Sequence, residues 1–271
     1  YDSANGAFEK WSLRDPDSAD AYLALGNVAI FQGEEARATE LLREALKLDP
    51  ENSEIRSRLA DIYRDRAIIK YQKEKQYLKA YETFNMAIEI APSPDANDYF
   101  LRALTYARAL TMGQMNAEGS YQPAIDDYRK ALELHTSGHP LSFGRQICAF
   151  LNIQELYILE SKYDKAAQAS LEFIKLESKE VKGDAVNMLL SHFHALVASI
   201  LAGKPYQKPV QEFQDSLRCI EPQVLNSRQW SFGLLKKYLI KRDPPVPAQQ
   251  AAIINELISQ LEAEIKPFPG A

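Results

Sequence analysis

Histidines are the side chains of this sequence that first suggest metal or acid–base chemistry, and the chain has four of them. His192 and His194 are two residues apart, which places them about 200° apart around a helix, so they cannot share a metal ion. His135 and His139 are expected to fall in a turn, where no set of cysteine and carboxylate ligands surrounds them. There is no glycine-rich phosphate loop, no Gly-x-Ser-x-Gly and no His-Glu-x-x-His sequence. We therefore predict no metal, no cofactor and no catalytic site.

Composition excludes several further classes of protein. Two cysteines, Cys148 and Cys219, are too few for a disulfide framework or a zinc site, and isolated thiols favour the cytoplasm in a chain whose compartment is otherwise unknown. The 32 basic and 37 acidic residues give a net charge of −5, which argues against a nucleic-acid partner. No apolar run approaches the roughly 18 residues of a membrane span. The basic stretch 236–242 is interpreted as a solvated helix face.

One helical pattern occurs four times along the chain. The segments 34–50, 77–92, 121–135 and 163–177 each place a small residue near the start and Ala or Phe seven positions later. The first three also place a large side chain four positions after the small residue, where 163–177 has Ser170. Residues 19–52 form the clearest unit, in which Gly26 and Ala38 allow two antiparallel helices to approach closely while Leu42 fills the space beside them. Pro50 ends the second helix, because proline cannot continue the hydrogen-bond ladder.

This unit resembles the tetratricopeptide repeat family closely. The positions that carry the resemblance are Tyr22, Leu25, Gly26, Ala29, Ala38, Leu42, Ala45 and Pro50. The pattern continues with lower fidelity through 53–92, 96–134 and 147–178, where Gln154 replaces the glycine. The resemblance implies an all-α fold, a right-handed α-solenoid of antiparallel helix pairs near 19–48, 54–91, 96–134 and 141–177.

The spacing of the repeats adds detail. The small residue that opens each second helix falls at Ala4, Ala38, Ala80, Ala124 and Ala166, at intervals of 34, 42, 44 and 42 residues. The repeats are thus lengthened to about 42 residues. The first excess lacks Gly and Pro and predicts about two extra helical turns before Ala80. The second contains Gly113 and Gly119 and predicts a loop, and the third contains a linker followed by a helix start near Leu141.

Three regions follow from this division. Residues 1–16 match the second helix of a repeat whose first helix is missing, so the chain is expected to be part of something longer. Residues 17–220 hold the repeats 19–52, 53–92, 95–135, 140–178 and 183–219. Residues 221–271 are expected to form C-terminal capping helices, in which Ile254, Leu257, Ile258, Leu261 and Ile265 make one apolar stripe.

The resemblance implies binding on the concave face that the first helices line. The residues expected there are Leu23, Asn27, Arg58, Asp61, Phe100, Leu104, Asn152 and Glu155. We expect this face to take a peptide or a helix of a protein partner, unless the long helices or the C-terminal segment of the chain fill it. Asp61, three residues after Arg58, is expected to neutralise it. The carboxylate clamp of chaperone-binding relatives is not expected, since Asn27 matches but Leu23, Arg58 and Leu101 do not.

Two other functions stay open. The chain could be the regulatory or sensor arm of a larger multidomain enzyme, or an assembly factor at a membrane. The leading hypothesis is a non-catalytic protein–protein interaction scaffold.

Overall fold

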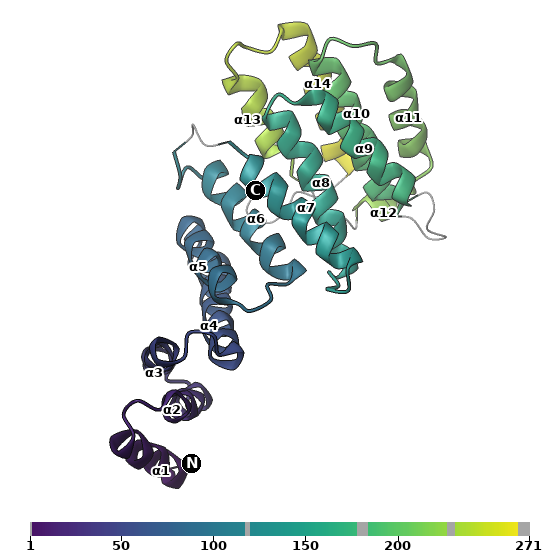
Figure 1. The fold of residues 1–271 in the computed structure, drawn as a ribbon. Helices are drawn as coiled ribbons and strands as arrows, with labels where there is room; N and C mark the ends of the chain where they lie inside the picture. Colours follow the sequence, from purple (N-terminus) through teal and green to yellow (C-terminus); the bar gives the residue numbers. More distant parts are fainter. Residues whose placement is uncertain (1, 117–119, 178–183, 227–230, 265–271) are drawn as a thin grey trace. The chain divides into compact units, whose positions relative to one another are not determined.

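The computed structural model describes residues 2–116, 120–177, 184–226 and 231–264, and every regular element in these ranges is an α-helix (Figure 1). The first seven helices are α1 (Asp2–Arg14), α2 (Ala19–Phe31), α3 (Glu35–Leu48), α4 (Ser53–Gln72), α5 (Tyr77–Ile90), α6 (Ala96–Thr111) and α7 (Gln122–Thr136). The next seven are α8 (Phe143–Leu159), α9 (Tyr163–Glu177), α10 (Ala185–Leu201), α11 (Gln207–Arg218), α12 (Pro222–Asn226), α13 (Gly233–Lys241) and α14 (Ala248–Glu264). The predicted all-α class is confirmed, and three of the predicted helix pairs, α2 with α3, α4 with α5 and α8 with α9, pack as expected. The pair predicted at 96–134 stays a prediction.

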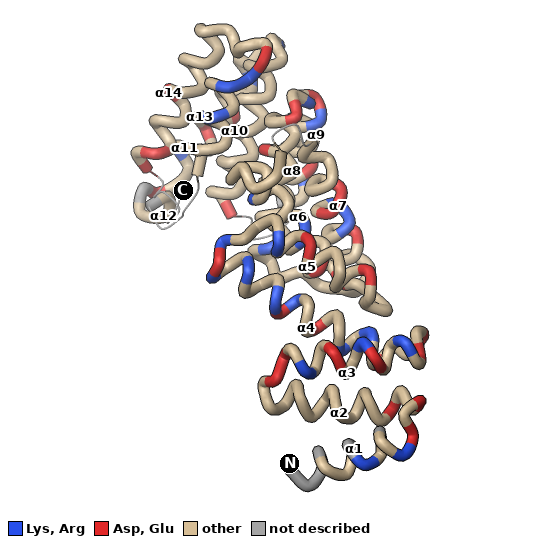
Figure 2. Tube along the Cα trace, turned by 90° about the vertical axis from the view of Figure 1, so that its left-hand side faces the viewer, with Lys and Arg blue, Asp and Glu red and all other residues tan. Residues whose placement is uncertain are grey.

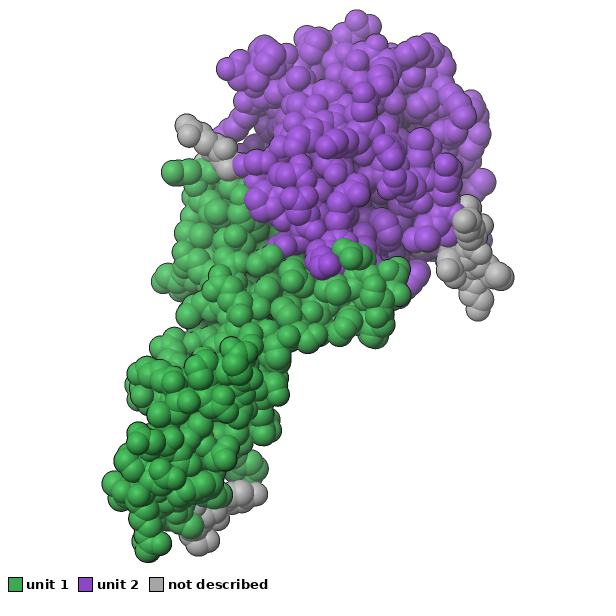
Figure 3. Space-filling view, in the orientation of Figure 1, with its two compact units in different colours: residues 1–117, 133–140 green, residues 118–132, 141–271 purple. Residues whose placement is uncertain are grey.

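The chain divides into two compact units, coloured separately in Figure 3. Unit 1 consists of residues 1–117 and 133–140, and unit 2 of residues 118–132 and 141–271. In unit 1 each helix from α1 to α5 packs against the next one along the chain. In unit 2 the pairs α8–α9, α9–α10 and α10–α11 pack in the same way.

Small residues at the helix contacts make this packing possible. Ala38, Ala80, Ala124 and Ala166 all have 0% exposure, as their place in the repeated pattern predicts. Ala4 belongs to the same series, but its side chain lies outside the described residues. Such fully buried alanines leave room for the large side chain of the neighbouring helix.

Gly26 is a position where α2 lies very close to a side chain of α3. A Cβ atom built there would lie 2.8 Å from Leu42 Cγ and 2.9 Å from Leu42 Cδ2, and Leu42 itself is fully buried. A side chain at residue 26 would therefore collide with the leucine, which is the reason that the sequence pattern suggested for this glycine.

Polar side chains fix the beginnings of several first helices. Ser18 accepts a hydrogen bond from the backbone N–H of Ala21, and Asn52 accepts from those of Glu54 and Ile55. Each bond satisfies an N–H group that the first turn of a helix leaves unpaired.

The first lengthened segment is helical, as predicted. α4 has 20 residues where α2 has 13, and it continues without interruption to Gln72. Lys75, with φ of 56°, lies in the turn that leads into α5. In the second lengthened segment α6 ends at Thr111, so Gly113 follows the helix, as expected, while Gly119 lies outside the described residues. A general repeat length of about 42 residues stays a prediction.

Unit 2 ends in three further helices. The helices α10 and α11 both fall within the repeat predicted at 183–219. In α14 the residues Ile254, Ile258 and Leu261 are fully buried and Leu257 is half-buried, while Ile265 lies outside the described residues. α14 packs against α10 and α12, and α13 packs against α8. Across the described ranges, none of the helices has both the length and the apolar character needed to span a bilayer.

Candidate binding surface

In unit 1 the first helices of the pairs are α2, α4 and α6, and the residues on the side of these helices that is predicted to be concave define what we call the first-helix surface. Its members on α2 are Asp20, Leu23, Asn27, Ile30 and Phe31, those on α4 are Glu54, Arg58, Asp61, Arg64 and Asp65, and those on α6 are Phe100, Leu104 and Arg108. Leu23 belongs to the same apolar cluster as Ile55 and Ile62, so α2 and α4 share a core beneath this surface.

The structure separates the residues predicted for this surface by their exposure. Arg58 and Asp61 are exposed, whereas Asn27 and Leu104 are half-buried. Leu23 and Phe100 retain only 8% and 5% of their exposure, so they contribute mainly to the core. Within the described residues the Oδ1 atom of Asn27 is buried without a hydrogen-bond donor. Such an unpaired acceptor costs about 1–3 kcal/mol.

The expected pairing of Arg58 with Asp61 is wrong. Arg58 instead approaches Glu54, one turn earlier, with an N···O distance of 3.6 Å. Asp61 accepts a hydrogen bond of 2.7 Å from Nη1 of Arg64. Residues at i, i+3 and i+4 are all neighbours on a helix, so sequence spacing alone could not select between these partners.

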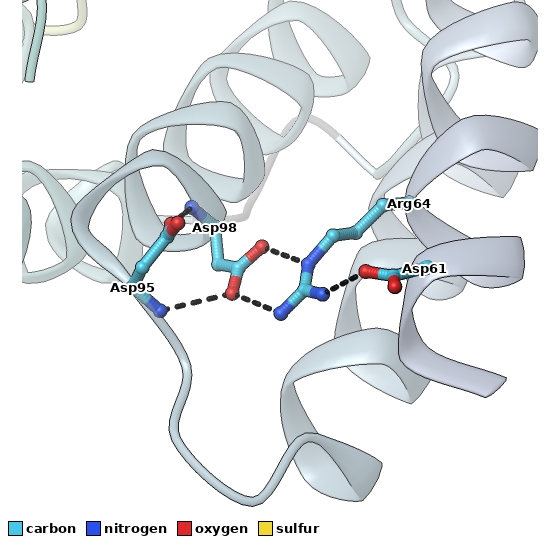
Figure 4. A network of polar contacts seen from close by, with 4 residues as sticks. All are labelled: Asp61, Arg64, Asp95 and Asp98. Carbon is cyan, nitrogen blue, oxygen red and sulfur yellow. Dashed lines mark hydrogen bonds and ion pairs between the residues drawn. The ribbon is translucent and has the colours of Figure 1, made fainter. Parts of the chain in front are cut away.

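Arg64 is the residue of this surface that sequence reasoning missed, and it connects α4 to α6 (Figure 4). Its Nε and Nη2 atoms donate to the two carboxylate oxygens of Asp98 at 2.6 and 2.7 Å. Asp98 has only 2% exposure and also accepts a bond from the backbone N–H of Asp95, as part of the capping box that begins α6. The hydrogen bonds of Arg64 raise its pKa above the ordinary value, and the bonds to Asp98 have the largest effect. A bidentate pair of this kind fixes the distance between two helices.

The spacing of the repeats did not indicate this pair. Arg64 lies in the middle of α4, whereas Asp98 lies in the first turn of α6, so the two residues occupy different positions of their repeats.

The corresponding surface of unit 2 is covered. Thirteen of the 17 residues of α10 are buried, including residues on all sides of the helix. α14 packs against α10, and the ring of Phe232, just before α13, meets Phe193 of α10 with centroids 5.2 Å apart. Residues on the remaining sides of α10 contact α9, α11 and α8. The C-terminal helices thus lie against the first helices of this unit.

Hydroxyl groups fix α13 at the turn between α8 and α9. The Tyr238 hydroxyl forms hydrogen bonds of 2.8 Å with Ser161 Oγ and 2.7 Å with the Tyr163 hydroxyl. The guanidinium of Arg242 lies over the rings of Tyr163 and Tyr238 at 5.5 and 5.9 Å. Burial raises the pKa of Tyr238 well above its ordinary value.

Two predicted site residues lie on α8, in unit 2. Asn152 is half-buried and donates a hydrogen bond of 3.3 Å to the Tyr128 hydroxyl. Glu155 keeps 6% exposure, and its charge adds to the effect of burial in raising the pKa of Tyr121. The sequence pattern placed both on the same face as the unit 1 residues without indicating these internal contacts.

A buried polar cluster lies between α8 and α10. Gln154 donates to Ser191 Oγ at 3.1 Å, and its Oε1 atom lies 3.0 Å from Nδ1 of His194. All three side chains are almost fully buried, and burial lowers the pKa of His194 to about 3. His194 is therefore neutral in the folded chain. No group of three His, Cys, Asp or Glu side chains within the described ranges is arranged to hold a metal ion.

A shallow hollow beside the α8–α9 turn contains three lysines. Lys162 donates to Gln122 at 2.7 Å, Lys204 contacts Asp164 at 2.6 Å, and Lys165 lies over the ring of Tyr157. Because each of these cations has an internal partner, the hollow is a weaker candidate for a binding site than the first-helix surface of unit 1.

Comparison with known proteins finds a family match for one part of the chain. Residues 19–62 match the model of the tetratricopeptide repeat, whereas a search of curated proteins gives no match. Among solved structures, the chain is similar to YrrB, a TPR protein with an unusual peptide-binding site, with 16% identity over 80% of this chain and 95% of that one and a TM-score of 0.42. It is also similar to the type IV pilus biogenesis factor PilW, with 19% identity over 93% and 94% of the two chains and a TM-score of 0.40.

A third similar structure is that of Naa15/Naa10 bound to HypK-THB, with 16% identity, a TM-score of 0.46, and coverage of 96% of this chain but 34% of that one. Identities and TM-scores this low do not carry function from one protein to another. The match of residues 19–62 coincides with α2, α3 and the first half of α4, where the sequence pattern is complete. The chain therefore contains a tetratricopeptide repeat at residues 19–62, within an all-α series of packed helix pairs.

Proposed function

We propose that this chain is a non-catalytic protein–protein interaction scaffold that binds a peptide or a helix of a partner on the concave face formed by its first helices. The observation that carries this proposal is the contrast between the two units. In unit 1 the outward residues of α2 and α4 include exposed apolar and charged side chains, whereas in unit 2 the C-terminal helices pack against α8 and α10. We therefore assign the partner contacts to unit 1.

Several groups of the first-helix surface suit this role. Ile30 and Phe31 are 38% and 64% exposed at the end of α2, and a partner could bury both. Apolar and aromatic side chains of this kind often supply much of an interface energy. The unpaired Oδ1 atom of Asn27 offers an acceptor that a donor on a bound peptide would satisfy after a small side-chain rotation.

The division of roles that we propose follows burial. Asn27, Arg58, Asp61 and Leu104 would contact the partner, while Leu23 and Phe100 would support them from the core. Phe100 is consequently a poor residue to replace in a binding test, because truncating a buried aromatic ring costs about 3–5 kcal/mol of stability.

A peptide-display selection on the folded chain tests the proposal. Peptides that it selects should lose more than about tenfold in affinity when Asn27, Arg58 and Leu104 are all replaced by Ala, since a tenfold loss needs only about 1.4 kcal/mol in total and a few interface residues carry most of the binding energy. The matched control replaces Lys79, Glu82 and Met86, which are exposed on the second helix α5. Binding that is lost in the control and kept in the test variant would move the site to the second helices.

A further inference from the structure

The first-helix surface carries more acidic than basic side chains, and this excess indicates which kind of partner it can bind. The inference rests on the proposed function. Glu54, Arg58, Asp61 and Asp65 follow one another at intervals of four, three and four residues, so they form one stripe along α4. All four side chains are exposed. Three of the four are acidic, and α2 adds Asp20 at its beginning without any basic residue (Figure 2).

The basic groups of this surface are already engaged within unit 1. Arg58 approaches Glu54, and Arg64 uses both edges of its guanidinium for Asp98 and Asp61. Arg108, at the end of α6, is half-buried and interacts with Tyr71. Burial raises the pKa of Tyr71, and the charge of Arg108 and its hydrogen bond oppose that rise. A carboxylate from a partner would have to displace one of these contacts.

The acidic groups are far more accessible. Glu54 and Asp61 keep 56% and 62% of their side-chain exposure in spite of their ion pairs. Asp20 and Asp65 are exposed and contact no cation within the described ranges. The first-helix surface thus carries more carboxylate than guanidinium charge, beside the apolar side chains Ile30, Phe31 and Leu104.

We infer that the partner of this surface is a basic amphipathic segment, a peptide or helix that carries Lys or Arg together with apolar side chains. Its cations meet the stripe of α4 and Asp20, and its apolar residues cover Ile30, Phe31 and Leu104. Carboxylates that remain largely solvated lose little hydration on pairing, so the attraction acts mainly on the rate and specificity of association and weakens with salt. Acidic segments are excluded by like-charge repulsion.

The probe is a set of synthetic peptides that share one apolar pattern and carry Lys, Glu or Gln at the polar positions. The Lys peptide is expected to bind the full chain at least about tenfold more tightly than the Glu peptide, because each exposed ion pair contributes up to about 1 kcal/mol. Raising the salt concentration from about 0.05 to about 0.5 M is expected to remove most of this preference.

A charge-matched pair of variants locates the effect. The triple variant Glu54→Gln, Asp61→Asn and Asp65→Asn should lose the preference for Lys, whereas Glu40→Gln, Glu82→Gln and Glu89→Gln on the outward sides of α3 and α5 should keep it. Both variants change the net charge equally, so a general charge effect would alter them alike and overturn the inference. Equal binding of the three peptides that is still lost on Asn27, Arg58 and Leu104 replacement would refute the basic partner but leave the scaffold proposal standing. Absence of binding by these peptides and by display-selected ones would overturn both.

Discussion

Gly26 is the residue whose replacement most directly tests how α2 packs on α3. Alanine at this position gains about 1 kcal/mol of helix propensity, but its Cβ would lie 2.8 Å from Cγ of the fully buried Leu42. Overpacking of this kind costs about 1–3 kcal/mol, so Gly26→Ala should lower the free energy of unfolding by roughly 1 kcal/mol. Urea denaturation measures the difference.

Gly6 supplies the matched control for that variant. It also lies within a helix, α1, but a Cβ atom there would meet nothing within 4 Å. Gly6→Ala should therefore leave stability unchanged or raise it by about 0.5–1 kcal/mol. If both variants shift the free energy of unfolding in the same direction, the close contact with Leu42 is not the reason that residue 26 is a glycine.

Asp98 and Asp61 both bind Arg64, so replacing each of them by Asn compares a buried with an exposed partner of the same side chain. Asp98→Asn removes a buried charge that binds Arg64 through two oxygens, and breaking such a pair costs about 3 kcal/mol or more. Asp61→Asn removes a contact in which the carboxylate is 62% exposed, and this should cost less than about 1 kcal/mol. Thermal and urea unfolding of the two variants should differ clearly, and similar losses would show that burial of Asp98 does not determine the strength of the pair.

At the scale of elements, the C-terminal helix α14 should stabilise unit 2 through its buried stripe. Leu261 has 0% exposure and Leu257 is half-buried, so the two leucines form a matched pair on one helix. Leu261→Ala should destabilise by about 2–5 kcal/mol and Leu257→Ala by markedly less. Hydrogen exchange of the amides in α10 reports the loss, and equal protection in both variants would mean that α14 does not stabilise the helix it covers.

The elements themselves were largely predictable, because their signals are local. The alanine series identified the helices α3, α5, α7 and α9, and the run before Ala80 without Gly or Pro predicted the longer α4. Contacts between distant segments were not predictable in the same way. The bond from Tyr238 to Ser161 joins residues 77 positions apart, and no local spacing indicates it. The sequence accordingly allowed that the C-terminal segment packs against the first helices, but it did not indicate which residues make the contacts.

The candidate site was predicted only in part, for a similar reason. A helical period identifies which residues share a face, and the exposure of Arg58 and Asp61 on α4 agrees with it. It does not tell how deeply a side chain is buried, which is why the buried Phe100 was grouped with them. It also cannot select among neighbouring ion-pair partners, and so Arg64 was missed.

For the molecule as a whole, the buried His194 should make the stability of unit 2 more sensitive to acid than that of unit 1. Unit 2 contains His192 and His194, whereas His135 and His139 lie in unit 1. Burial lowers the pKa of His194 to about 3, and burial also lowers that of His192, against the opposing charge of Glu212. A histidine in the unfolded chain has a pKa of about 6.5.

We predict that acid destabilises unit 2 between pH 7 and pH 5, in which most carboxylates stay ionised. Between pH 6.5 and pH 3 the unfolded chain binds a proton at residue 194 that the folded chain does not bind, so the free energy of unfolding rises with pH. That contribution is complete above pH 6.5 and falls by about 1.4 kcal/mol for each pH unit below it, or roughly 2 kcal/mol at pH 5.

Hydrogen exchange, corrected for the intrinsic rate at each pH, should show α8 and α10 losing protection while α2 to α5 keep theirs. His194→Gln, which retains an amide able to bond Gln154, should lower stability at pH 7 but reduce its dependence on pH. An unchanged pH dependence in this variant would assign the acid sensitivity to other groups.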